Sequence, residues 1–149
     1  MHNLFGQVSI YFPEIWKEYF DTYCQSTNAG ARERSDKYPF PRNVDMWFLA
    51  ICLAVHHKID PDFSEKGKMY KPIPGTVFGS ELWRSDSLIL LAISHSGDEK
   101  IIDNPNEMIK IANAYAIAGF PSLMAMLEES KGDSPLDFIS DYVIDLIEA

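Results

Sequence analysis

The chain has 149 residues, the size of one ordinary domain, of which 46% are hydrophobic and 23% charged. This composition excludes a disordered chain, a collagen and a coiled-coil rod, and a domain of this length folds without a disulfide or a metal. The formal net charge is −9, and it lies entirely in residues 76–149, because residues 1–75 carry equal numbers of acidic and basic groups. Since phosphates repel an acidic surface, direct nucleic-acid binding through the C-terminal half is not expected.

The sequence shows no sign of membrane insertion or export. No window approaches about 18 consecutive apolar residues, the length that a membrane-spanning helix requires. The N-terminal stretch lacks the basic region and the cleavage pattern of a signal peptide. Cys24 and Cys52 occur in apolar, helix-like stretches, and Cys52 is expected to be a buried structural thiol. Together these features predict a cytoplasmic location.

The N-terminal third predicts one helix and one loop. Pro13 suits the first turn of a helix over residues 13–27. A wide apolar stripe follows at helical spacing, formed by Ile15, Trp16, Tyr19, Phe20 and Tyr23. Residues 28–42 read as a loop, because Gly30, Pro39 and Pro41 interrupt any regular pattern.

The middle of the chain predicts a central helix, a long loop and a third helix. Asn43 is the expected cap of a helix that runs to about Lys58 and is apolar almost all round, which is typical of the buried centre of a domain. Residues 59–80 are rich in proline and glycine, and a short strand or hairpin arm is possible at 73–78. The third helix begins at Glu81 or Ser85 and ends at Ser96, with Gly97 as its left-handed cap.

The C-terminal third carries the clearest helix signals. The run Asn104-Pro105-Asn106-Glu107 predicts a capped helix to about Ala118 that stops at Gly119, and Pro121 begins a further short helix through Glu129, ended by Gly132. Ser134-Pro135-Leu136-Asp137 then predicts the last helix. We therefore expect an all-α single domain over 1–149 with about five to six helices. It comprises an N-terminal helix plus loop (1–42) and a helical core (43–149), and the loop 59–80 can hold a short β element.

No catalytic motif is present. The sequence lacks HExxH, CxxC, G-x-S-x-G and the glycine-rich phosphate loops. His56 and His57 are adjacent, so they cannot chelate one metal as an i, i+4 pair does, and with His95 they are interpreted as favourable cations at helix C-termini. A metal site built from His56, His95 and a distant carboxylate remains an alternative. No catalytic residue, metal or cofactor is predicted, and the chain is interpreted as a non-enzyme.

The loop before the central helix combines aromatic rings, prolines and basic groups. Aromatic residues make up 13% of the chain, and tyrosine and arginine are enriched in interface hot spots. The candidate partner-binding residues are Arg32, Arg34, Lys37, Tyr38, Phe40 and Arg42. The alternative is a solvated loop that its own aromatic rings hold over the core.

The order of segments after residue 43 resembles a known family. The segments are VDMWFLAICLAVHHKID, VFGSELW, SLILLAISHSGDEKII, IKIANAYAIAGFPSLMAML and DSPLDFISDYVIDLIE. Over residues 44–148 they resemble the small proteins associated with bacterial DNA phosphorothioation (dnd) systems. The chain differs from that pattern at Ala118 and in its N-terminal helix, which leaves open a branch that serves a different defence system. The resemblance implies a cytoplasmic accessory protein of a DNA-modification or antiphage system, and it implies no catalytic residues.

These observations favour a non-catalytic adaptor that binds another protein of such a system. An acidic face attracts basic partners, so a DNA-binding protein is one possible partner. The first alternative is a DNA-binding or regulatory module that uses the basic loop 32–42. The second is a small metal-dependent nuclease or hydrolase. Homo-oligomerisation is compatible with the sequence, although no pattern encodes it.

Overall fold

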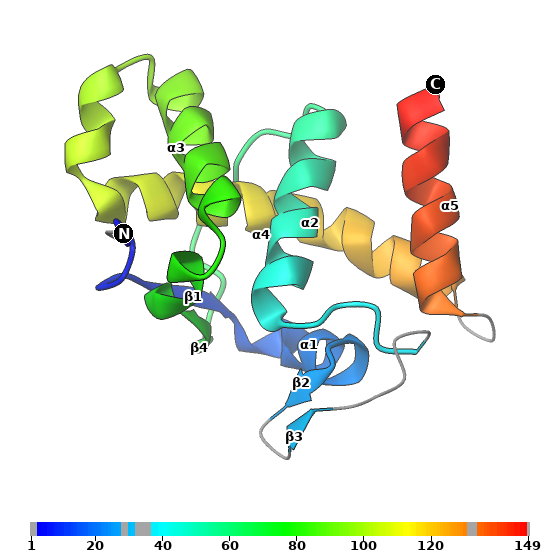
Figure 1. Ribbon diagram of the computed structural model, residues 1–149. Helices are drawn as coiled ribbons and strands as arrows, with labels where there is room; N and C mark the ends of the chain where they lie inside the picture. The colour runs from blue at the N-terminus through cyan, green and yellow to red at the C-terminus, as the bar shows by residue number, and fades with distance from the viewer. Residues whose placement is uncertain (1–2, 28–29, 32–36, 131–133, 149) are drawn as a thin grey trace.

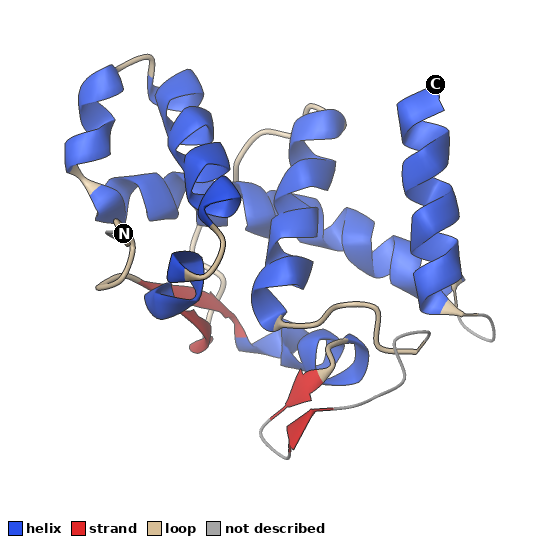
Figure 2. Cartoon of the chain, in the orientation of Figure 1, coloured by secondary structure: helices blue, strands red, loops and turns tan. Residues whose placement is uncertain are grey.

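The computed structural model describes residues 3–27, 30–31, 37–130 and 134–148 and confirms a mainly helical fold with a small β element (Figures 1 and 2). The α-helices are α1 (Lys17–Tyr23), α2 (Asn43–His56), α3 (Leu82–Ser96), α4 (Pro105–Glu129) and α5 (Pro135–Glu148). Three short 3₁₀ helices are η1 (Glu14–Trp16), η2 (Gly75–Gly79) and η3 (Glu99–Asp103). The strands are β1 (Ser9–Pro13), β2 (Ser26–Thr27), β3 (Gly30–Ala31) and β4 (Met69–Pro74).

The long helix α4 packs against α2, α3 and α5. Figure 1 shows α3, α2 and α5 rising side by side from α4, while α1 and the β1–β4 ribbon lie below. Helix α2 makes the most extensive packing with α4, and it occupies the middle of the row. Helices α3 and α5 lie on either side of α2.

Helix α4 is continuous, which corrects the prediction of two helices broken at Gly119. Pro121 lies inside the helix, and its side chain is exposed, so the pyrrolidine ring faces solvent and not the core. A Cβ added at Gly119 would lie 1.9 Å from the carbonyl oxygen of Ala50 and 3.0 Å from Cβ of Ala54. The glycine is therefore present for close approach of α2, and the packing of the two helices outweighs its weak helix propensity.

The N-terminal segment begins as a strand, which corrects the prediction of a single helix over residues 13–27. Strand β1 pairs antiparallel with β4, and the pairing shifts register between Ile10 and Phe12. The prolines of β4 suit a two-stranded ribbon, because neither is needed as a donor in a central strand. The loop 59–80 thus carries its β element at Met69–Pro74, and residues 75–79 form η2 instead of a strand.

An aromatic cluster joins the N-terminal segment to α4. The ring of Phe120 stacks on Trp16 at 4.7 Å between centroids and lies edge-on to Phe12 at 5.1 Å. Phe20 of α1 also stacks on Phe120. Phe12, Phe20 and Phe120 are fully buried. The segment 1–42 is therefore part of the same core as 43–149, and no separate N-terminal unit exists within the described residues.

Most helix ends follow the signals in the sequence. The Asn104 side chain accepts a hydrogen bond from the Glu107 amide at 3.3 Å, and Gly97 has φ of 70° at the end of α3. At the start of α2 the structure differs from the prediction, because Asn43 donates to the carbonyl of Pro72 and Asp45 accepts from the Arg42 amide at 2.9 Å. Within the part of the chain that is described, no helix is both long and apolar enough to cross a bilayer.

Candidate functional site

The structure describes four of the six predicted partner-binding residues, and these four differ in how far they are buried. Arg32 and Arg34 lie outside the described residues. Lys37 is exposed and Tyr38 is half-buried, whereas Phe40 is buried. The Phe40 N–H donates to the carbonyl of Tyr23 in α1, and its carbonyl accepts from the Gln25 N–H. Phe40 therefore contributes to the core, as expected for a loop that an aromatic ring holds in place.

Arg42 is part of a polar cluster that joins the start of α2 to the start of α3. Its guanidinium donates to Ser80 Oγ at 3.2 Å and lies 3.8 Å from a carboxylate oxygen of Glu81. The buried Arg84 contacts both Glu81, at 2.6 Å, and Asp45. The three ion pairs Arg42–Glu81, Arg84–Glu81 and Arg84–Asp45 hold the starts of α2 and α3 together. Because Arg84 is buried, its guanidinium serves this internal contact and is not exposed to a partner.

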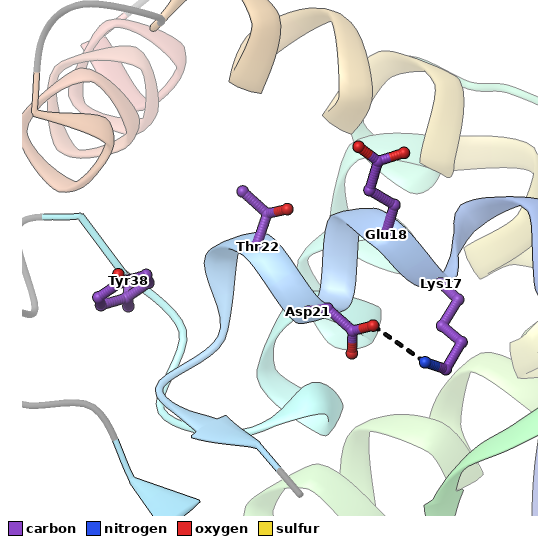
Figure 3. Close-up of a pocket in the computed structure, with 5 residues that line it drawn as sticks. All are labelled: Lys17, Glu18, Asp21, Thr22 and Tyr38. Carbon is purple, nitrogen blue, oxygen red and sulfur yellow. Dashed lines mark hydrogen bonds and ion pairs between the residues drawn. The ribbon is translucent and has the colours of Figure 1, made fainter. Parts of the chain in front are cut away.

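An open pocket of about 530 Å³ lies beside Tyr38 (Figure 3). Its other lining residues are Lys17, Glu18, Asp21 and Thr22, all from α1. The ammonium of Lys17 bonds Asp21 at 3.0 Å, and both side chains are about half exposed. An exposed pair of this kind is well solvated and contributes little to stability.

The histidines take part in contacts between elements. His57, at the end of α2, lies 3.4 Å from the hydroxyl of Tyr142 on α5. His95, near the end of α3, lies 3.4 Å from the hydroxyl of Tyr115 on α4. Among the described residues, no group of three or more His, Cys, Asp or Glu side chains is placed to hold a metal ion. His56 and His95 are therefore not brought together with a carboxylate into such a group.

The clearest concave surface is an apolar groove of about 640 Å³ between α2 and α3. We call it the α2–α3 groove, and its lining residues are Phe48, Ile51, Cys52, Val55, His56, Ser87, Leu88, Leu90 and Leu91. Leu90 is 68% exposed and Val55 is 49% exposed, while Trp83 extends the apolar surface by packing edge-on against Phe48. Among the residues that the structure describes, no carboxylate lines this groove, although the chain is strongly acidic.

Cys52 lies in this groove and is exposed, which corrects the prediction of a buried thiol. The prediction failed because α2 is apolar on every side, and the sequence therefore gives no sign of which side stays uncovered. The surrounding apolar side chains raise the pKa of the Cys52 thiol, although a hydrogen bond to its own backbone acts in the opposite direction. The thiol is accordingly protonated at neutral pH and is not an activated nucleophile.

The outer face of α5 is a second exposed apolar surface, and it is acidic. Ile147 is 77% exposed and Ile144 is 49% exposed. The exposed carboxylates of α5 are those of Asp137, Asp141, Asp145 and Glu148, and their spacing places them along one side of the helix. Among the described residues, none of these carboxylates belongs to an ion pair. We call the two isoleucines and four carboxylates the α5 face.

The α5 face could have been found from the sequence, because DFISDYVIDLIE contains more apolar residues than one packed stripe needs. Pro135 is the one buried residue of this helix, and Phe138, Ile139, Tyr142 and Leu146 are only partly buried against the core. The α2–α3 groove had a weaker signal, because residues 43–56 are uniformly apolar.

Comparison with protein-family models, curated proteins and solved structures found no match. The two surfaces are consequently interpreted from the geometry of this chain. Both surfaces expose large apolar side chains to solvent.

Proposed function

We propose that this protein is a non-catalytic adaptor that binds a basic partner protein through the α5 face. The observation that carries this proposal is the exposure of Ile144 and Ile147 beside a row of carboxylates without ion-pair partners among the described residues. A large apolar side chain that stays exposed on a helix surface gains free energy when a partner covers it.

The negative charge of the α5 face favours a partner with basic side chains. The carboxylates of Asp137, Asp141 and Asp145 are spaced four residues apart, so a single ridge of negative charge lies next to the isoleucines. A complementary partner presents lysines or arginines beside apolar side chains, as one face of a basic amphipathic helix does. DNA-binding proteins commonly carry such basic segments, and the acidic adaptor would compete with DNA phosphates for them.

The resemblance of residues 44–148 to dnd-associated proteins supports a place for this adaptor in a bacterial DNA-modification or antiphage system. Within such a system, the partner would be a basic, DNA-binding protein. The adaptor itself would act in the cytoplasm and would not contact DNA through its acidic C-terminal half.

The proposal is tested by capturing the tagged full-length protein from its host and by measuring binding of a synthetic lysine- and leucine-rich amphipathic peptide by calorimetry. We expect one stoichiometric basic partner, and an affinity for the peptide that falls as salt is raised, because the charges of the α5 face lie at the surface. A matched glutamate- and leucine-rich peptide should not bind.

Ile147→Asp should remove both interactions, whereas Ile15→Asp provides the matched control. Each of these isoleucines is 77% exposed, so neither change is expected to unfold the protein, but Ile15 lies in η1 away from α5. Equal loss of binding in the two variants, or capture of only acidic partners, would contradict the proposal.

A further inference from the structure

Helix α5 carries apolar side chains on two of its sides. The side chains that pack against the core are those of Phe138, Ile139, Tyr142 and Leu146. Among the described residues, four further aliphatic side chains of α5 are not packed against this core, those of Leu136, Val143, Ile144 and Ile147. The first two of these are half-buried, and the two isoleucines are exposed. A helix that packs on one neighbour needs a single apolar stripe, so α5 has a second stripe that nothing in the described part of the chain covers.

The second stripe has the spacing of a helix-packing seam. Leu136, Ser140, Val143 and Ile147 follow one another at intervals of four, three and four residues, which is the repeat by which two helices pack side by side. At about 100° per residue, the three aliphatic members lie within about 40° of one another around the helix axis. They extend along that axis for about 16 Å, or about three turns. We call these four residues the outer seam, and Ser140 is its small, exposed member.

The carboxylates of α5 lie along one flank of the outer seam. On that flank the helical spacing places Ile144 first and then the carboxylates, of which Asp137 and Glu148 are the nearest to the seam. On the other flank it places Ile139 and Leu146, which pack against the core. A partner that covers the outer seam therefore meets negative charge on one flank and the body of the protein on the other. Charge complementarity assigns lysines or arginines to the side of the partner that faces Asp137 and Glu148.

We infer that the partner docks a single α-helix lengthwise on α5, with its apolar stripe on the outer seam and its basic side chains beside Asp137 and Glu148. This inference rests on the proposed adaptor function and deepens it, because it assigns the seam residues and the form of the partner's contact. An extended strand presents apolar residues at every second position and cannot follow intervals of four and three residues, whereas a helix can. Ser140 lies in the middle of the seam, where its small side chain allows the two helices to approach closely.

Ser140→Asp separates helix docking from general attraction between opposite charges. Ser140 is exposed, so the variant should fold, which circular dichroism checks. A helix on the outer seam would bury the new carboxylate among apolar side chains, and we expect the affinity for the lysine- and leucine-rich peptide to fall by about tenfold or more. General attraction to an acidic surface would instead raise the affinity, because the variant carries one more negative charge. Thr76→Asp adds the same charge at an exposed position in η2 and should leave the affinity unchanged.

Two peptides of identical composition test the spacing on the unaltered protein. In the first peptide the leucines are four and three residues apart, and in the second they are spread evenly around the helix. Calorimetry should show tight binding of the first peptide alone, and its circular dichroism should become more helical on binding, because the outer seam accepts a continuous apolar stripe.

The outcomes distinguish this inference from the proposed function on which it rests. Equal binding of the two peptides, or tighter binding by Ser140→Asp, would overturn helix docking on the outer seam while leaving the α5 face as a site for a basic partner. Binding of neither peptide, together with capture of no basic protein from the host, would overturn the proposed function as well.

Discussion

Individual polar side chains secure the loops and the N-terminal strand to α4. The amide of Asn113 accepts from the indole N–H of Trp47 at 2.9 Å and donates to the carbonyl of Tyr11 at 2.7 Å, so one residue connects α2, α4 and β1. In the loop after α2, the backbone N–H of Asp62 donates to the carbonyl of Ala114 on α4. The Asp62 carboxylate bonds Lys66 at 2.6 Å. These contacts hold the loop after α2 and strand β1 against α4.

The Asp62 carboxylate provides a prediction at this scale. Hydrogen bonds from Lys66 and then from Ser64 lower the pKa of Asp62 from 3.8 to about 2. Because the folded state has the lower pKa, these bonds contribute stability above pH 3.8, and the contribution is lost as the pH falls toward 2. Lys66→Met should therefore raise the pKa of Asp62 toward 3.8, as measured by NMR titration of the side-chain carboxyl carbon.

Lys68→Met is the control for this titration, since Lys68 lies 3.4 Å from Glu14 and is not among the groups that lower the pKa of Asp62. An unchanged Asp62 pKa in Lys66→Met, or an equal rise in Lys68→Met, would show that Lys66 does not hold the carboxylate in its ionised form.

At the scale of elements, the fold depends on how closely α2 can approach α4. Gly119 and Ala50 are the positions where the two helices meet most tightly, and both are buried. The residues around them on α2 are small or apolar, so the contact continues toward Ala54. Helix α5 shows the opposite situation, because it leaves two isoleucines exposed.

Gly119→Ala tests the close approach. An added Cβ would collide with the carbonyl of Ala50, and backbone cannot move aside as a flexible side chain can. Although alanine favours a helix by about 1 kcal/mol over glycine, overpacking typically costs 1–3 kcal/mol or more, so we expect a net loss of about 2 kcal/mol in the free energy of unfolding. Urea denaturation measures this loss.

Gly6→Ala is the control, because a Cβ at Gly6 would meet no atom closer than 3.4 Å. A Gly119→Ala protein as stable as the wild type would show that α2 and α4 lie farther apart than the structure has them.

At the scale of the whole molecule, the N-terminal segment completes the core. Ile10 and Phe12 of β1 are buried, and Phe12 contacts rings from η1, α1 and α4. The protein therefore folds as one unit in which the first strand covers the aromatic side of α4. Helices α3 and α5 lie on opposite sides of α2 in Figure 1.

Phe12→Ala measures the contribution of the N-terminal strand. Removing a fully buried phenylalanine typically costs 3–5 kcal/mol, so the variant should unfold at much lower urea concentration and should lose the helical circular dichroism of the entire chain in one transition. Tyr11→Ser, at the neighbouring position of the same strand, should have little effect because Tyr11 is 54% exposed. Equal stability of the two variants would mean that residues 43–149 fold independently of β1.

The sequence by itself determined the helices whose ends carry chemical signals. Gly97 ends α3, Asn104 begins α4 and Ser134 begins α5 within one residue of the predicted positions, because each signal satisfies backbone groups locally. The apolar content also predicted α2 as the central helix.

Tertiary structure decided the features that depend on residues far apart in the chain. It paired residues 9–13 with residues 69–74, kept α4 continuous through Gly119 and Pro121, and left Cys52 exposed between α2 and α3. Each of these three features depends on which distant segment packs against the residues concerned. Local spacing contains no such information, because the free energy that settles these choices comes from burial against distant segments.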